Sequence, residues 1–120
     1  MAEDLLHKVD IDWLLTIYGA MLTDKQRSIA TLYFEEDYSL AEIAQQEGVS
    51  RQSVHETLQR VEKQLRTLEE KLGMRRRLTK VQENLEKALA ALEGENTSLA
   101  RLSIENALNL LTDEEEANGL

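Results

Sequence analysis

The chain has 120 residues, enough for one domain with a modest core, and it carries a formal net charge of −9. It contains no cysteine, which excludes a disulfide framework, a thiolate metal site and a cysteine nucleophile. It also lacks proline and β-branched runs of strand length, so the composition predicts an all-α helical bundle.

The first predicted helix covers residues 5–21. Its apolar residues recur at helical intervals and form one wide face: Leu5, Leu6, Val9, Trp13, Leu14, Ile17, Tyr18 and Met21. The segment before it, Met1–Asp4, contains two acidic residues and no basic one, and no apolar stretch approaches the roughly 18 residues of a membrane span. We therefore expect a cytoplasmic protein without membrane contact.

Two capping boxes predict the next helix starts. Thr23 with Gln26 begins a helix that is expected to end near Phe34. Ser39 with Glu42 begins a short helix, which Gly48 ends.

A long helix is predicted to begin at Ser50 and to end near Gly73, with a length of about 20 residues. Its apolar residues follow a heptad pattern: Val54, Leu58, Val61, Leu65, Leu68 and Leu72. Two interpretations of this stripe stay open. It is either a core face against the first and fifth helices or the seam of a dimer.

The C-terminal part predicts two more amphipathic helices. One carries Leu78 to Leu92 and stops at Gly94, and Thr97 or Ser98 is expected to cap the other. We expect a helix-turn-helix domain at residues 1–74 and a helical pair at 75–111 that packs on it or forms a dimer interface. Residues 112–120 are expected to be an acidic flexible tail. The amount of apolar surface predicts a homodimer.

The segment Ser39–Lys63 has the layout of a helix-turn-helix. Ala44 is small where a second helix would cross, and Gly48 permits the left-handed conformation of a tight turn. Ser50 then caps the second helix and leaves backbone N–H groups where a phosphate binds.

The second helix of this motif offers polar side chains on surfaces that the apolar stripe does not use. Arg and Gln form bidentate hydrogen bonds with base edges, which makes this helix a candidate recognition helix for double-stranded DNA. The candidate DNA-binding residues are Ser50, Arg51, Gln52, Ser53, His55, Glu56, Gln59, Arg60 and Lys63. A basic cluster at Arg75–Arg77 and Lys80 is either a second phosphate contact or an ordinary charged helix start.

The net negative charge argues against DNA, but acidic residues concentrate at the two ends of the chain and the middle is neutral to basic. Catalysis has little support, because His7 and His55 are isolated and no phosphate loop, metal motif or nucleophile elbow occurs. We therefore expect no enzymatic activity, no metal and no cofactor.

Ser39–Leu72 resembles region 4 of bacterial sigma factors. A closer resemblance, over about residues 5–74, is to the YlxM family of bacterial helix-turn-helix proteins. The residues that carry it are Leu14–Arg27, Leu32–Ala44, Gly48–Val54 and Glu69–Met74. Proteins of this family are encoded beside the signal recognition particle GTPase. The resemblance implies a regulatory DNA-binding protein without catalytic residues, with a link to protein targeting.

Two functions are therefore open. One is a DNA-binding regulator, linked to the signal recognition particle or to the transcription machinery. The other is an adaptor that uses the same fold to bind a protein or a ribonucleoprotein. Salt separates them, because a phosphate-dominated complex weakens steeply as salt rises.

Overall fold

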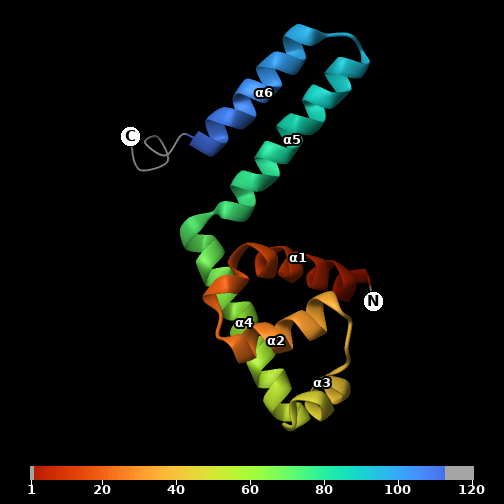
Figure 1. The fold of residues 1–120 in the computed structure, drawn as a ribbon, viewed down its shortest axis with the longest axis vertical. Helices are drawn as coiled ribbons and strands as arrows, with labels where there is room; N and C mark the ends of the chain where they lie inside the picture. The colour runs from red at the N-terminus through yellow and green to blue at the C-terminus, as the bar shows by residue number, and fades with distance from the viewer. Residues whose placement is uncertain (1, 113–120) are drawn as a thin grey trace. The chain divides into compact units, whose positions relative to one another are not determined.

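A computed structural model describes residues 2–112 (Figure 1). Of the expected acidic tail at 112–120, only residue 112 is described, and the other positions lie outside the described residues. The elements are α1 (Ala2–Tyr18), the 3-10 turn η1 (Gly19–Met21), α2 (Asp24–Ala30), the π-helical turn η2 (Thr31–Glu35), α3 (Leu40–Glu47), α4 (Arg51–Leu72), α5 (Met74–Glu93) and α6 (Thr97–Thr112). Residues 2–112 contain no strand, so the predicted all-α fold is confirmed.

The chain divides between Gly73 and Met74 into two compact units. The first unit holds α1 to α4, and the second is an antiparallel hairpin of α5 and α6 (Figure 1).

Helix α4 is the central element of the first unit, and α1, α2 and α3 all pack against it. The first four residues of its apolar stripe, from Val54 to Leu65, are buried, whereas Leu72 is 49% exposed. This part of the stripe is therefore the core face of the first unit. Its helical neighbours there are α1, α2 and α3. The predicted helix of about 20 residues is confirmed, since α4 has 22 and ends at Gly73 in the left-handed conformation.

Helix α1 buries only part of the apolar face that its sequence predicts, namely Leu14 and Tyr18. The buried residues are Ile11, Leu14, Leu15 and Tyr18. Leu5, Leu6, Val9 and Trp13 lie on the opposite side of the helix and are exposed, Trp13 at 38%. The buried side is therefore only partly the predicted apolar face, because α1 is apolar on two sides and periodicity does not tell which side the protein covers.

The capping box of α2 is confirmed, and the helical run that it begins continues to Glu35, near the predicted end at Phe34, with its last turn π-helical. The Thr23 Oγ1 accepts from the Gln26 N–H at 3.2 Å, and the Thr23 N–H donates to Gln26 Oε1 at 3.1 Å. After Ala30 the chain widens into the π-helical turn η2, and the Glu36 N–H donates to the Thr31 carbonyl at 3.1 Å. Sequence patterns of period 3.6 carry no signal for such a local widening.

The hairpin is held together by small side chains rather than by its leucines. Its buried residues are Val81, Ala88, Ala91, Ala100, Ser103 and Ala107. The cap of α6 also differs from the prediction: Asn96 Oδ1 accepts from the Leu99 N–H at 3.1 Å, so Asn96 is the N-cap in place of Thr97 or Ser98.

Candidate nucleic-acid interface

The turn between α3 and α4 depends on Gly48. Gly48 has φ of 68° and ψ of 35°, a left-handed conformation that glycine adopts without steric cost. The N–H groups of Gly48 and Val49 both donate to the Ala44 carbonyl, which closes the end of α3. Ile43 and Val54 are fully buried beneath the turn. The two helices are therefore fixed to each other through one small core.

Helix α4 begins at the cap that the sequence predicts. The Ser50 Oγ accepts from the Ser53 N–H at 3.0 Å, and Ser50 itself has extended backbone angles. The remaining N–H groups of the first turn point out from the start of α4, where backbone donors favour an anion.

A second capping box fixes the start of α3. The Ser39 Oγ accepts from the Glu42 N–H at 3.1 Å, and the Ser39 N–H donates to Glu42 Oε1 at 2.9 Å. These hydrogen bonds stabilise the carboxylate, so the pKa of Glu42 lies below its ordinary value, chiefly because of the bond from the Ser39 backbone. Glu42 therefore carries a full negative charge near the motif.

The candidate residues lie mainly on the solvent side of α4. Ser53 is half-buried and all the others are exposed, namely Ser50, Arg51, Gln52, His55, Glu56, Gln59, Arg60 and Lys63. Spacings of 4, 3 and 4 residues place Gln52, Glu56, Gln59 and Lys63 in one row, opposite the buried stripe. We call these four residues the outer row of α4.

Part of the outer row is already engaged. The Gln52 Nε2 donates to Glu56 Oε1 at 3.2 Å. Glu56 therefore holds the amide that would otherwise read a base, and any base contact by Gln52 exchanges this bond for a new one.

A polar network that the sequence does not predict lies beside the outer row. The His7 Nε2 lies 2.7 Å from Glu62 Oε1, Arg66 Nε lies 3.4 Å from Glu62 Oε2, and Arg66 also pairs with Asp10 at 3.6 Å. These contacts join α1 to α4, next to a groove that His55 and Gln59 line. The i, i+4 spacing of Glu62 and Arg66 is a visible signal, but nothing local indicates that His7 meets Glu62.

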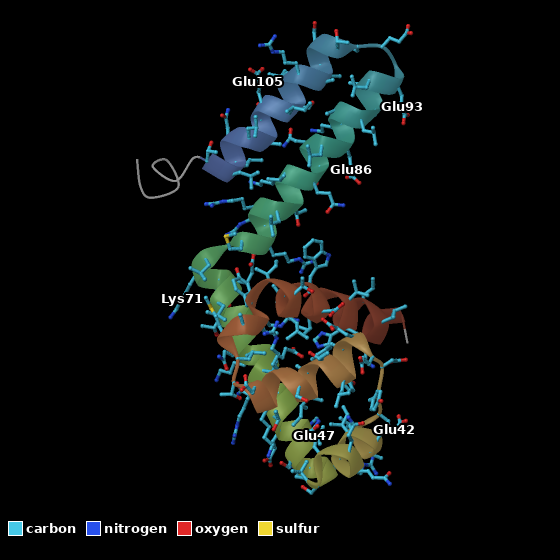
Figure 2. All side chains as sticks on the ribbon, in the orientation of Figure 1. Glu42, Glu47, Lys71, Glu86, Glu93 and Glu105 are labelled. Carbon is cyan, nitrogen blue, oxygen red and sulfur yellow. The ribbon has the colours of Figure 1, made fainter. Side chains whose placement is uncertain are left out.

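The charges around the motif are mixed. Arg51, Arg60 and Lys63 supply positive charge on α4, whereas Glu42 and Glu47 place negative charge on α3 (Figure 2). Among residues 5–112, no three His, Cys, Asp or Glu side chains are placed to hold a metal ion. The arrangement offers hydrogen-bond donors, a few cations and a helix start, which are groups that bind anions and polar partners.

The fold and this site define a helix-turn-helix protein. The chain matches the family described as "Putative helix-turn-helix protein, YlxM / p13 like" over residues 5–102, and it belongs to that family. This confirms the family resemblance and extends it beyond residue 74 into the hairpin.

Relatives span most of the chain. A UPF0122 protein of Desulforamulus reducens is 37% identical over 105 residues, which is 88% of each chain. A UPF0122 protein of Geobacillus kaustophilus is 41% identical over 95 residues, covering 77% of this chain and 86% of the relative. No solved structure matches significantly. Over residues 2–112, no helix combines the length and apolarity that crossing a membrane requires.

Proposed function

We propose that this chain is a cytoplasmic regulatory protein that binds double-stranded DNA through α4. The observation that carries the proposal is the outer row of α4, an exposed polar row on a 22-residue helix whose opposite face is buried in the core. A helix held in this way presents its polar side rigidly, as major-groove recognition requires.

In this proposal the N-terminal half of α4 enters the major groove. Arg51 and Gln52 lie nearest the bases, and His55 and Gln59 follow one and two turns later. Arg60 and Lys63 lie farther along the helix, where a cation reaches phosphate. Glu56 either accepts from a cytosine amino group or repels the backbone.

We further propose that the protein binds DNA as a homodimer, because helix-turn-helix proteins read two half-sites related by twofold symmetry. A link to the signal recognition particle or to the transcription machinery stays a prediction of the family resemblance.

The test is fluorescence anisotropy with a selected oligonucleotide pool at two salt concentrations. Arg51→Ala is expected to cost about 1–3 kcal/mol at the preferred site and to relax its sequence preference. Lys63→Ala is expected to weaken all sequences similarly and to reduce the salt slope by about one. Lys71→Ala, an exposed lysine in the last turn of the same helix, is the matched control and should change neither quantity (Figure 2). If the wild type selects no sequence and binds no better than Arg51→Ala, α4 does not read DNA.

The acidic surroundings of the motif favour a second candidate, an adaptor that binds a protein or a ribonucleoprotein. Glu42 and Glu47 on α3 and Glu56 on α4 repel phosphate, but they suit a basic protein surface. An interface between these carboxylates and a basic surface also weakens as salt rises, so salt alone does not separate the two functions. Sequence selection separates them: a wild type that selects no sequence and binds DNA no better than Arg51→Ala favours the adaptor.

A further inference from the structure

The hairpin of α5 and α6 carries large apolar side chains that its own two helices leave exposed. Its large apolar side chains are among the most exposed in the protein, with Leu89 at 61% and Leu108 at 54%. The buried seam between the two helices contains only Val81, alanines and a serine. The exposed leucines therefore lie outside the buried seam that joins α5 to α6.

Six of the eight exposed large apolar residues of the two helices lie on one face of the hairpin, whereas Leu99 and Leu102 lie on the other side of α6. Leu85, Leu89 and Leu92 follow one another at helical spacing, about 90° clockwise of the seam when α5 is viewed from its N-terminus. On α6, the stripe of Ile104, Leu108 and Leu111 also lies clockwise of the seam when that helix is viewed from its own N-terminus. Because the helices are antiparallel, the two stripes meet on one side. We call these six residues the leucine face.

We propose that the leucine face binds the leucine face of a second copy of this chain, so that two hairpins form a four-helix bundle. This proposal rests on the proposed function in one respect, because it supplies the interface of the homodimer proposed there. Units below about 40 residues usually need a disulfide, a metal or association to be stable. The hairpin consists of a 20-residue and a 16-residue helix, and the chain has no cysteine.

The size of the face fits a dimer. At about 1.5 Å per residue the helices are about 24–30 Å long, and two helices packed side by side are about 20 Å wide. The plan area is on the order of 500 Å², and the accessible surface of a ridged face exceeds its plan area. Stable interfaces bury about 800 Å² on each partner, which is the same scale.

The charge pattern along α5 favours a second copy in one orientation. The first half of the helix, residues 74–83, has a net charge of +3 from Arg75, Arg76, Arg77, Lys80 and Glu83, whereas the second half, residues 84–93, has a net charge of −1 from Glu86, Lys87 and Glu93. A twofold axis across the middle of α5 places the basic half of one copy beside the acidic half of the other. A surface with this polarity is complementary to itself when it is turned end to end.

The other symmetric arrangement, with α5 on α6 of the partner, is disfavoured. Glu86 and Glu105 lie at the same level of the hairpin, on its two outer edges (Figure 2). That arrangement places Glu86 of one copy beside Glu105 of the other, and like charges repel. We therefore infer that α5 packs antiparallel on α5 of the partner, near Leu85.

The first test is the molecular mass of the full chain by sedimentation equilibrium at tens of micromolar. The wild type is expected to have twice the 13.7 kDa of one chain, and Leu89→Glu is expected to have the mass of one. Leu6→Glu is the matched control, because Leu6 is 69% exposed on α1, outside the hairpin. Leu6→Glu should remain a dimer. A monomeric wild type, or dissociation by Leu6→Glu, would overturn the proposal.

The second test measures how α5 is oriented against α5 of the partner. It does not use Leu89→Glu, so it remains valid even if that variant unfolds the hairpin. Since the chain has no cysteine, Leu85→Cys introduces a single thiol near the proposed axis, and oxidation is expected to link two chains. Leu92→Cys places its thiol far from its symmetry mate and should stay unlinked. The reverse result would contradict the antiparallel arrangement.

The DNA measurement separates the two proposals. Arg51→Ala should lose sequence preference and remain a dimer, whereas Leu89→Glu should become a monomer that still prefers the same half-site with lower affinity. A dimeric wild type that binds no DNA would leave the leucine face supported and would refute the proposed function alone.

Discussion

The helix-turn-helix unit and the C-terminal hairpin bury different kinds of side chain. Around α4 the buried residues are mostly large, with Ile43, Val54 and Leu65 fully enclosed. Between α5 and α6 they are mostly alanines, and the leucines face outward. Both regions show apolar residues at helical spacing in the sequence. The comparison teaches that periodicity identifies an amphipathic helix but does not tell whether the same chain covers its apolar side.

The largest expected difference concerns a buried leucine and an exposed one. Leu65→Ala, at a site with no exposure, should destabilise the first unit by about 2–5 kcal/mol, because it leaves a cavity in a packed core. Leu89→Ala removes the same atoms from an exposed site and should change the unfolding free energy of the monomer by about 0.5 kcal/mol or less. Denaturant unfolding at a concentration too low for dimers measures both. Equal losses would remove the distinction between the units.

A smaller effect is expected from filling the alanine seam. Ala100 is 2% exposed between the two helices of the hairpin, so Ala100→Leu should force them apart and cost about 1–3 kcal/mol. Ala90→Leu enlarges an exposed alanine on α5 and is the control. Thermal melts followed by circular dichroism should show the hairpin melting earlier while the first unit is unchanged. If Ala100→Leu were neutral, the small seam would not be a tight contact.

The smallest expected effect is a pH dependence of stability that the capping box of α3 should show and the capping box of α2 should not. The folded-state pKa of Glu42 lies below its ordinary value of 4.5, so its contribution to stability is present above 4.5 and is lost as the pH falls through the lower folded-state pKa. Glu42→Gln should therefore lower the melting temperature at neutral pH, and the gap from wild type should close in acid. Gln26 fills the same position in the box of α2 without titrating, so the loss in Gln26→Ala should not depend on that pH range. If the difference in melting temperature between Glu42→Gln and the wild type persisted in acid, the loss would come from the changed side-chain geometry rather than from the lost charge.

Local features could be predicted from the sequence because their causes lie within a few residues. Both capping boxes, the left-handed Gly48 and the long α4 depend on hydrogen bonds and backbone angles near their own positions. The π-helical turn after Ala30 was not predictable in this way, since a pattern of one period does not register a local change of pitch.

The all-α class, the order of the helices and the polar row of the motif could be inferred from the sequence alone. Tertiary packing was needed to show which of the two apolar sides of α1 is buried, that His7 reaches Glu62, and that mostly alanines fill the seam between α5 and α6. The physical reason is that burial belongs to a pair of surfaces. A single helix carries the pattern for one surface, and its neighbour in space, distant in the chain, decides whether that surface is covered.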